Sequence, residues 1–128
     1  MKIVNLDTYT ISLDDLEWTD LAKLGDLTNY DRIAQDDVID AIGTAEVALF
    51  TSKVKITRQI MDACPNLKFI GVTATGYDNI DIAAAKEKGI AVCNVPAYST
   101  EAVAQHTFAL LLEITNNVGL HNQAVQDS

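Results

Sequence analysis

The stretch of residues 69–105, FIGVTATGYDNIDIAAAKEKGIAVCNVPAYSTEAVAQ, decides the fold. It opens with Phe69–Val72, a short apolar run that is typical of a buried strand. A turn of small residues follows, and then the pattern predicts a helix over Ile82–Lys88. Asp81 is a candidate cap for the start of this helix, and Gly89 is suited to its end. The stretch therefore begins as a strand, a loop and a helix.

A second unit of the same kind follows directly. Ile90–Cys93 is the next apolar run, and we expect it to form a strand that ends in the loop Asn94–Pro96. Ser99 then precedes a long helical pattern, expected over Thr100–Val118. Strands that alternate with helices are typical of a parallel α/β sheet, in which ligands bind outside the carboxyl ends of the strands. Both loops lie at such ends.

The part of the chain before residue 69 repeats this alternation. Further strands are expected over Lys2–Leu6, Asp26–Tyr30 and Val47–Phe50, and further helices over Leu13–Leu24, Ala34–Ile42 and Thr57–Ala63. The predicted fold is α/β: a flavodoxin-like, five-stranded parallel sheet flanked by helices, followed by one long C-terminal helix. We assign residues 1–98 to one domain and 99–128 to a connecting helix and tail. The polar tail after Gly119 is expected to be frayed.

Composition excludes several classes of function. The chain has 128 residues, enough for one domain with a real core, and a formal net charge of −9. Acids are spread along the sequence, which argues against nucleic-acid binding, because phosphates require clustered Lys and Arg. No apolar run is long enough to span a membrane, and the N-terminus turns polar too soon for a signal peptide. Cys64 and Cys93 have no metal-ligand spacing, and free buried thiols in a cytoplasmic protein are favoured over a disulfide.

A longer motif covers the two loops and the start of the long helix. Its residues are Ala74–Asp81, Cys93–Glu101 and Val103–Thr107. This motif resembles the D-isomer-specific 2-hydroxyacid dehydrogenases, most nearly the glycerate dehydrogenase and hydroxypyruvate reductase branch, and a looser match extends back to Met1. The resemblance implies hydride transfer between NAD or NADP and a D-2-hydroxy acid or the corresponding 2-oxo acid.

Parts that the resemblance implies for a complete enzyme are missing from this sequence. There is no Gly-x-Gly-x-x-Gly turn for a dinucleotide pyrophosphate. The Arg that binds the substrate carboxylate, its partner carboxylate and the acid–base His have no counterpart, and neither His106 nor His121 matches that His. The chain is therefore expected to be a substrate domain followed by the start of a truncated NAD(P)-binding domain. We expect no cofactor to be bound and no activity from the chain alone.

Thr75 and Gly76 are the first candidate site residues. A tight turn at a strand end exposes backbone N–H groups, and glycine lets a ligand come close. The resemblance implies that these amides contact the substrate carboxylate. The alternative is a turn in which Gly76 only relieves backbone strain, and the surrounding motif favours the binding role.

Three further residues have weaker signals. Tyr98 follows the second loop, and the resemblance implies that an aromatic ring there walls the substrate pocket; packing under a connection is the alternative. Val103, in the first turn of the long helix, is implied to contact the nicotinamide ring, with an ordinary core role as its alternative. Lys53 lies at another strand end and could attract a carboxylate, although a solvated loop lysine is favoured.

Two other classes of protein share features with this sequence, the phospho-receiver domains and the non-catalytic interaction modules. A phospho-receiver domain needs paired acids after its first strand, whereas Asp7 stands alone, and the expected third strand ends without an Asp. A non-catalytic interaction module stays open, because the family includes transcriptional co-repressors that bind peptides with this domain. The acidic surface and the apolar final helix are compatible with such a role.

The long helix also predicts a partner. Its apolar stripe consists of Val103, Leu110, Leu111, Ile114 and Val118. A helix that is apolar over most of its circumference needs cover on both sides, and one domain can cover only one of them. We therefore expect a homodimer that associates through Thr100–Val118.

Overall fold

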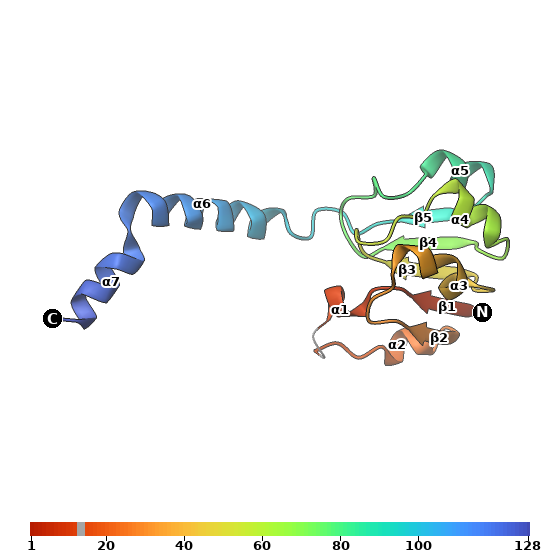
Figure 1. Ribbon diagram of the computed structural model, residues 1–128, viewed down its shortest axis with the longest axis horizontal. Coiled ribbons are helices and arrows are strands. Elements are labelled where there is room, and N and C mark those ends of the chain that lie inside the picture. Colours follow the sequence, from red (N-terminus) through yellow and green to blue (C-terminus); the bar gives the residue numbers. More distant parts are fainter. Residues whose placement is uncertain (13–14) are drawn as a thin grey trace. The chain divides into compact units, whose positions relative to one another are not determined.

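The computed structural model describes residues 1–12 and 15–128, and the chain divides into two units, residues 1–96 and 97–128 (Figure 1). The first unit contains a parallel sheet of five strands in the order β2-β1-β3-β4-β5. The strands are β1 (Lys2–Asn5), β2 (Asp26–Asn29), β3 (Val47–Phe50), β4 (Phe69–Val72) and β5 (Ala91–Cys93). This is the flavodoxin-like strand order, so the predicted fold class is confirmed.

Short helices connect these strands. They are α1 (Thr8–Ile11), α2 (Thr19–Ala22), α3 (Val38–Ile42), which follows a 3-10 turn over Gln35–Asp37, α4 (Arg58–Ala63) and α5 (Ile82–Glu87). Right-handed crossovers place α3, α4 and α5 together, and α4 contacts both of the others. These three helices therefore cover one face of the sheet.

The main core lies between that helical layer and the sheet. Alternate strand residues enter it, among them Val4, Phe50 and Ile70, all at most 2% exposed. Burying each such side chain contributes about 1.5–3 kcal/mol, so the period-two alternation selects which strand face turns inward. On the opposite face Leu49 is only half-buried and Cys93 is exposed, so the expectation of a buried thiol is wrong for Cys93, which lies on the edge strand β5.

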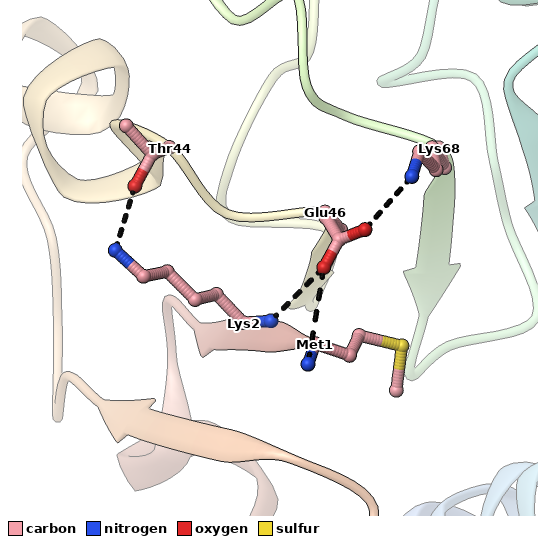
Figure 2. A network of polar contacts seen from close by, with 5 residues as sticks. All are labelled: Met1, Lys2, Thr44, Glu46 and Lys68. Atoms are coloured by element: carbon pink, nitrogen blue, oxygen red, sulfur yellow. Dashed lines mark hydrogen bonds and ion pairs between the residues drawn. The ribbon is translucent and has the colours of Figure 1, made fainter.

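A polar network joins three strands at the amino-terminal edge of the sheet (Figure 2). The Glu46 carboxylate accepts hydrogen bonds from Lys68 Nζ at 2.8 Å and from the backbone N–H of Lys2 at 3.3 Å. The Met1 ammonium lies 4.0 Å from the same carboxylate. The hydrogen bond from Lys68, followed by that from Lys2, lowers the pKa of Glu46 below its usual value. The network therefore ties β1, β3 and the entry to β4 together by charge.

The helix predicted over Leu13–Leu24 is wrong for the residues that the structure describes. Leu13 and Asp14 lie outside them, residues 15–18 are not helical, and α2 is a single turn. The Ser12 hydroxyl accepts hydrogen bonds from the N–H groups of residues 15 and 16, a capping pattern that no helix over residues 15–18 follows. Leu16 and Leu24 stay 50% and 64% exposed, so no buried apolar face stabilises a longer helix.

The second unit consists of α6 (Thr100–Asn116) and α7 (Val118–Gln126). The predicted long helix is confirmed, but it ends at Asn117, whose φ of 49° is left-handed. The prediction of a frayed tail after Gly119 is wrong, because α7 continues to Gln126. Within this unit no residue of either helix is buried. Among the described residues, no helix has the length and apolar character that crossing a membrane requires.

Candidate functional site

The turn after β4 is fastened to the loop after β5. The Asn94 side-chain amide donates to the Thr75 carbonyl at 2.7 Å, and the Thr75 hydroxyl donates to the Val95 carbonyl at 3.0 Å. The Val95 N–H donates to the Ala74 carbonyl at 3.1 Å. The carbonyl and hydroxyl of Thr75 are therefore used to hold the turn, and its backbone N–H remains for another partner.

On its other side, the same turn is joined to the loop after β3. The Thr73 N–H donates to the Phe50 carbonyl at 2.9 Å. The Asn79 side-chain amide donates to the carbonyls of Val54 and Thr51 at 2.6 and 3.3 Å. Asp81 then caps α5, because its carboxylate accepts from the Ala84 N–H at 2.9 Å. The capping role that the sequence indicates for Asp81 is thus present.

Thr75 and Gly76 are both exposed, and in the part of the chain that the structure describes their backbone N–H groups donate no hydrogen bond. Glycines at positive φ are Gly43 and Gly89, so Gly76 does not occupy a backbone conformation that demands glycine. A Cβ at Gly76 would lie 3.2 Å from a carboxylate oxygen of Asp78. The turn thus presents two N–H donors to solvent, with one negative charge beside them.

Lys53 lies apart from this turn. It is exposed, follows β3, and lines a cavity of about 300 Å³ to which Thr75 and Gly76 do not contribute. The other polar residues of the cavity are Asp7, Thr10 and Arg32. The structure therefore separates the three predicted site residues of the first unit into two places.

Tyr98 and Val103 belong to the second unit. Tyr98 follows Ala97, which has a φ of 57°, and Val103 lies in the first turn of α6. Both side chains are exposed. His106 and His121 lie on α6 and α7.

Asp7 and Arg32 are polar residues of this cavity that the sequence does not indicate as site residues. Asp7 lies two residues after the end of β1 and is 2% exposed. Its carboxylate accepts hydrogen bonds from the Thr10 hydroxyl at 2.7 Å and from the Thr51 hydroxyl. The available signal was position: both residues follow expected strands, and carboxyl ends of parallel strands share one edge of a sheet.

The model of the catalytic domain of the D-isomer specific 2-hydroxyacid dehydrogenases matches residues 7–126, nearly the whole chain. The chain belongs to this family. Among its relatives is a hydroxypyruvate reductase from Blautia hydrogenotrophica, 46% identical over 130 residues, which are 99% of this chain and 40% of that protein. A D-3-phosphoglycerate dehydrogenase from Methanocaldococcus jannaschii is 35% identical over 98 residues, 77% of this chain and 19% of the relative.

Solved structures of similar proteins share the fold. An acyclic imino acid reductase in complex with NADPH and D-Arg has a TM-score of 0.80 and 25% identity, over 99% of this chain and 41% of that one. A D-lactate dehydrogenase from Aquifex aeolicus, complexed with NAD and lactic acid, has a TM-score of 0.72 and 26% identity, over 99% of this chain and 37% of that one. The chain thus spans about two fifths of the length of the hydroxypyruvate reductase and of the two solved structures, and about one fifth of the length of the phosphoglycerate dehydrogenase.

The glycine spacing of this chain differs from that of a dinucleotide-binding turn. Its six glycines lie at positions 25, 43, 71, 76, 89 and 119, so no two have the Gly-x-Gly spacing that a pyrophosphate-binding turn uses. Among the described residues, no group of three His, Cys, Asp or Glu side chains is placed to hold a metal ion. Two places in the first unit that a ligand can reach are the exposed turn after β4 and the cavity beside Lys53.

Proposed function

We propose that this chain forms the substrate-binding wall of an oxidoreductase that transfers hydride between NAD or NADP and a D-2-hydroxy acid or 2-oxo acid. The observation that carries the proposal is the pair of unused N–H groups at Thr75 and Gly76, at the carboxyl end of β4. Carbonyl and side-chain hydrogen bonds fix this turn between two neighbouring loops. Two backbone N–H donors are therefore already in position to bind a substrate carboxylate.

These donors alone give weak binding. Each hydrogen bond contributes about 0.5–1.5 kcal/mol net, so two of them correspond to a dissociation constant in the millimolar range or above. The Asp78 carboxylate beside Gly76 opposes an approaching anion. In this proposal Tyr98 lines the substrate pocket and Val103 contacts the nicotinamide ring. Lys53 lines a different cavity.

An NMR titration with glycolate tests the carboxylate site. The amide signals of Thr75, Gly76 and Tyr77 should shift first. Replacing Asp78→Asn removes the opposing charge and should tighten glycolate binding severalfold. Asp40→Asn, on α3, is the matched control, because it changes the net charge equally at an exposed position elsewhere. Larger shifts at other amides, or equal tightening by both variants, would contradict the site.

The chain alone should not catalyse the reaction. It has no glycine-rich phosphate turn, and no Arg and His pair that matches the family's carboxylate and acid–base residues. The assay is oxidation of NADH and NADPH in the presence of hydroxypyruvate or glyoxylate, with preparations free of host enzymes. Turnover above the buffer blank would show that the chain carries its own cofactor and proton-transfer groups.

The apolar stripe of α6 supports a partner in the form of a second copy of the chain. Leu110, Leu111 and Ile114 are more than half exposed within their unit. Burying each such side chain would contribute about 1.5–3 kcal/mol of favourable free energy. An isologous pair through Thr100–Val118 would cover the stripe in both copies. The same stripe favours the second candidate function, a non-catalytic protein-interaction module, which needs no glycolate site at Thr75.

A further inference from the structure

The carboxylate of Asp7 is buried, and among the described residues no cation forms an ion pair with it. Two hydroxyl groups satisfy it instead. Thr10 donates to Oδ1 at 2.7 Å, and Thr51 donates to Oδ2. Removing a carboxylate from water is costly unless hydrogen bonds compensate for the lost hydration. Because both oxygens are used in this way, the buried carboxylate is suited to fix the positions of its two partners.

Thr51 extends this contact into the loop after β3. Its hydroxyl also accepts a hydrogen bond from the Lys53 N–H at 3.3 Å. Its carbonyl accepts one from the Val54 N–H at 3.3 Å and one from the Asn79 side-chain amide at 3.3 Å. Thr51 is itself buried, so water has little access to replace these partners. The residue therefore connects Asp7, after β1, with Asn79, after β4.

The segment that contains Asn79 is in turn paired with the loop after β3. The Ile56 N–H donates to the Asn79 carbonyl at 2.9 Å. The Ile80 N–H donates to the Tyr77 carbonyl at 3.1 Å, which closes the turn on this side. Tyr77 directly follows Gly76. The hydrogen-bonded path that begins at the buried carboxylate thus ends one residue from the turn's two free N–H groups.

We propose that Asp7 is a positioning residue for the turn after β4 and that it acts through Thr51. The inference rests on the proposed function, in which the N–H groups of Thr75 and Gly76 bind a substrate carboxylate. Two weak donors hold an anion only while both point to the same place, so binding depends on how firmly the turn is held. Among the described residues Asp7 makes no hydrogen bond with the turn, and its influence passes through the loop after β3.

NMR titrations of the full chain with glycolate test this path. Thr51→Val keeps the shape of the side chain but removes the hydroxyl, and it should raise the dissociation constant at Thr75 and Gly76 about threefold, because the turn is held less firmly. Thr51→Ser keeps the hydroxyl and should stay within about twofold of the native chain. Rescue by serine separates the hydrogen bond from a general effect of packing.

Thr10→Val is the matched control, because it removes the other hydroxyl donor of the same carboxylate without changing the loop after β3. Its dissociation constant should stay within about twofold of the native value. Asp7→Ala should weaken binding relative to Asp7→Asn, which removes the same charge but keeps an oxygen acceptor. The double variant Asp7→Ala with Thr51→Val should bind no more weakly than Thr51→Val, since both changes break the same bond.

Amide hydrogen exchange tests the same path without a ligand. In Thr51→Val, exchange at Ile56 and Ile80 should accelerate severalfold more than exchange at Ile70, which lies within β4 and reports unfolding of the sheet. Thr51→Ser should show no such difference. A preserved dispersion of the amide spectrum checks that each variant folds.

Two results would overturn the proposal: equal weakening of glycolate binding by Thr10→Val, or acceleration at Ile56 and Ile80 no larger than at Ile70. Selective acceleration in a chain whose native form does not bind glycolate would contradict the carboxylate site and support the positioning role of Asp7. The two proposals therefore fail separately.

Discussion

Asn79→Ala should destabilise the first unit by about 1–2 kcal/mol, as a balance of three terms. The substitution removes the hydrogen bonds from the Asn79 amide to the Val54 carbonyl at 2.6 Å and to the Thr51 carbonyl at 3.3 Å. Thr51 keeps a second donor, the Val54 N–H at 3.3 Å, whereas the Val54 carbonyl loses the shorter bond. Against this loss, Asn79 Oδ1 is buried without a partner among the described residues, so its removal relieves a desolvation cost.

Urea denaturation followed by circular dichroism measures the effect. With a slope of about 2 kcal/mol per molar urea, the midpoint should fall by about 0.5–1 M. Asn79→Asp should destabilise at least as much, because it keeps the shape and turns oxygens toward two carbonyl groups. Asn66→Ala, at an exposed loop position, is the control and should change little. An unchanged midpoint for Asn79→Ala, or a milder effect of Asn79→Asp, would refute this account of the joined loops.

Three further outcomes are expected. The Lys68 hydrogen bond lowers the pKa of folded Glu46 below 4.5, so the stability that ionised Glu46 contributes is present above that pH and is lost as the pH falls through the folded pKa. Glu46→Gln should therefore flatten the acidic part of a curve of stability against pH, and an unchanged acidic part would contradict this. Asp81→Ala should cost about 1 kcal/mol in urea denaturation through the lost cap of α5, and Asp81→Asn should restore most of it. Leu111→Glu with Ile114→Glu should convert a sedimenting dimer into a monomer or an aggregate; a compact native monomer that these changes leave unaltered would exclude the helix interface.

The sequence predicts the second half of the sheet closely because local signals and tertiary burial agree there. β4 has the predicted bounds, Phe69–Val72, since an apolar run between turn residues can only be buried in a sheet covered by helices. Asp81 caps α5 as expected, and Gly89, with a φ of 69°, ends it. In such a stretch each residue choice favours the same structure.

Local and tertiary signals diverge in two places. Leu16 and Leu24 have helical spacing, but spacing stabilises a helix only where its apolar face finds cover, and both side chains remain exposed. In the C-terminal tail a helix forms where the polar sequence predicts none. Its polar residues do not prevent α7, because a left-handed Asn117 ends one helix and starts the next. Neither outcome follows from hydrophobic periodicity.

The candidate site was predictable only where its residues are close in the sequence. Thr75 and Gly76 lie in one motif, and the structure places them in one turn. Asp7, Arg32 and Lys53 come from three separate loops, and only the order β2-β1-β3 brings them to one cavity. Strand order depends on which crossovers skip a neighbour, which a single sequence does not encode locally.

The loop after β3 joins the cavity beside Lys53 to the turn after β4, so some substitutions act on both. The Thr51 hydroxyl donates to Asp7 on the cavity side, while the Val54 carbonyl accepts from Asn79 on the side of the β4 turn. A change at Thr51 or Val54 would therefore disturb the cavity and the turn together. Arg32 belongs to the cavity alone, since its loop follows β2, which two other strands separate from β4. An Arg32→Gln variant that leaves the glycolate response of Thr75 constant would show that the turn after β4 does not depend on this cavity residue.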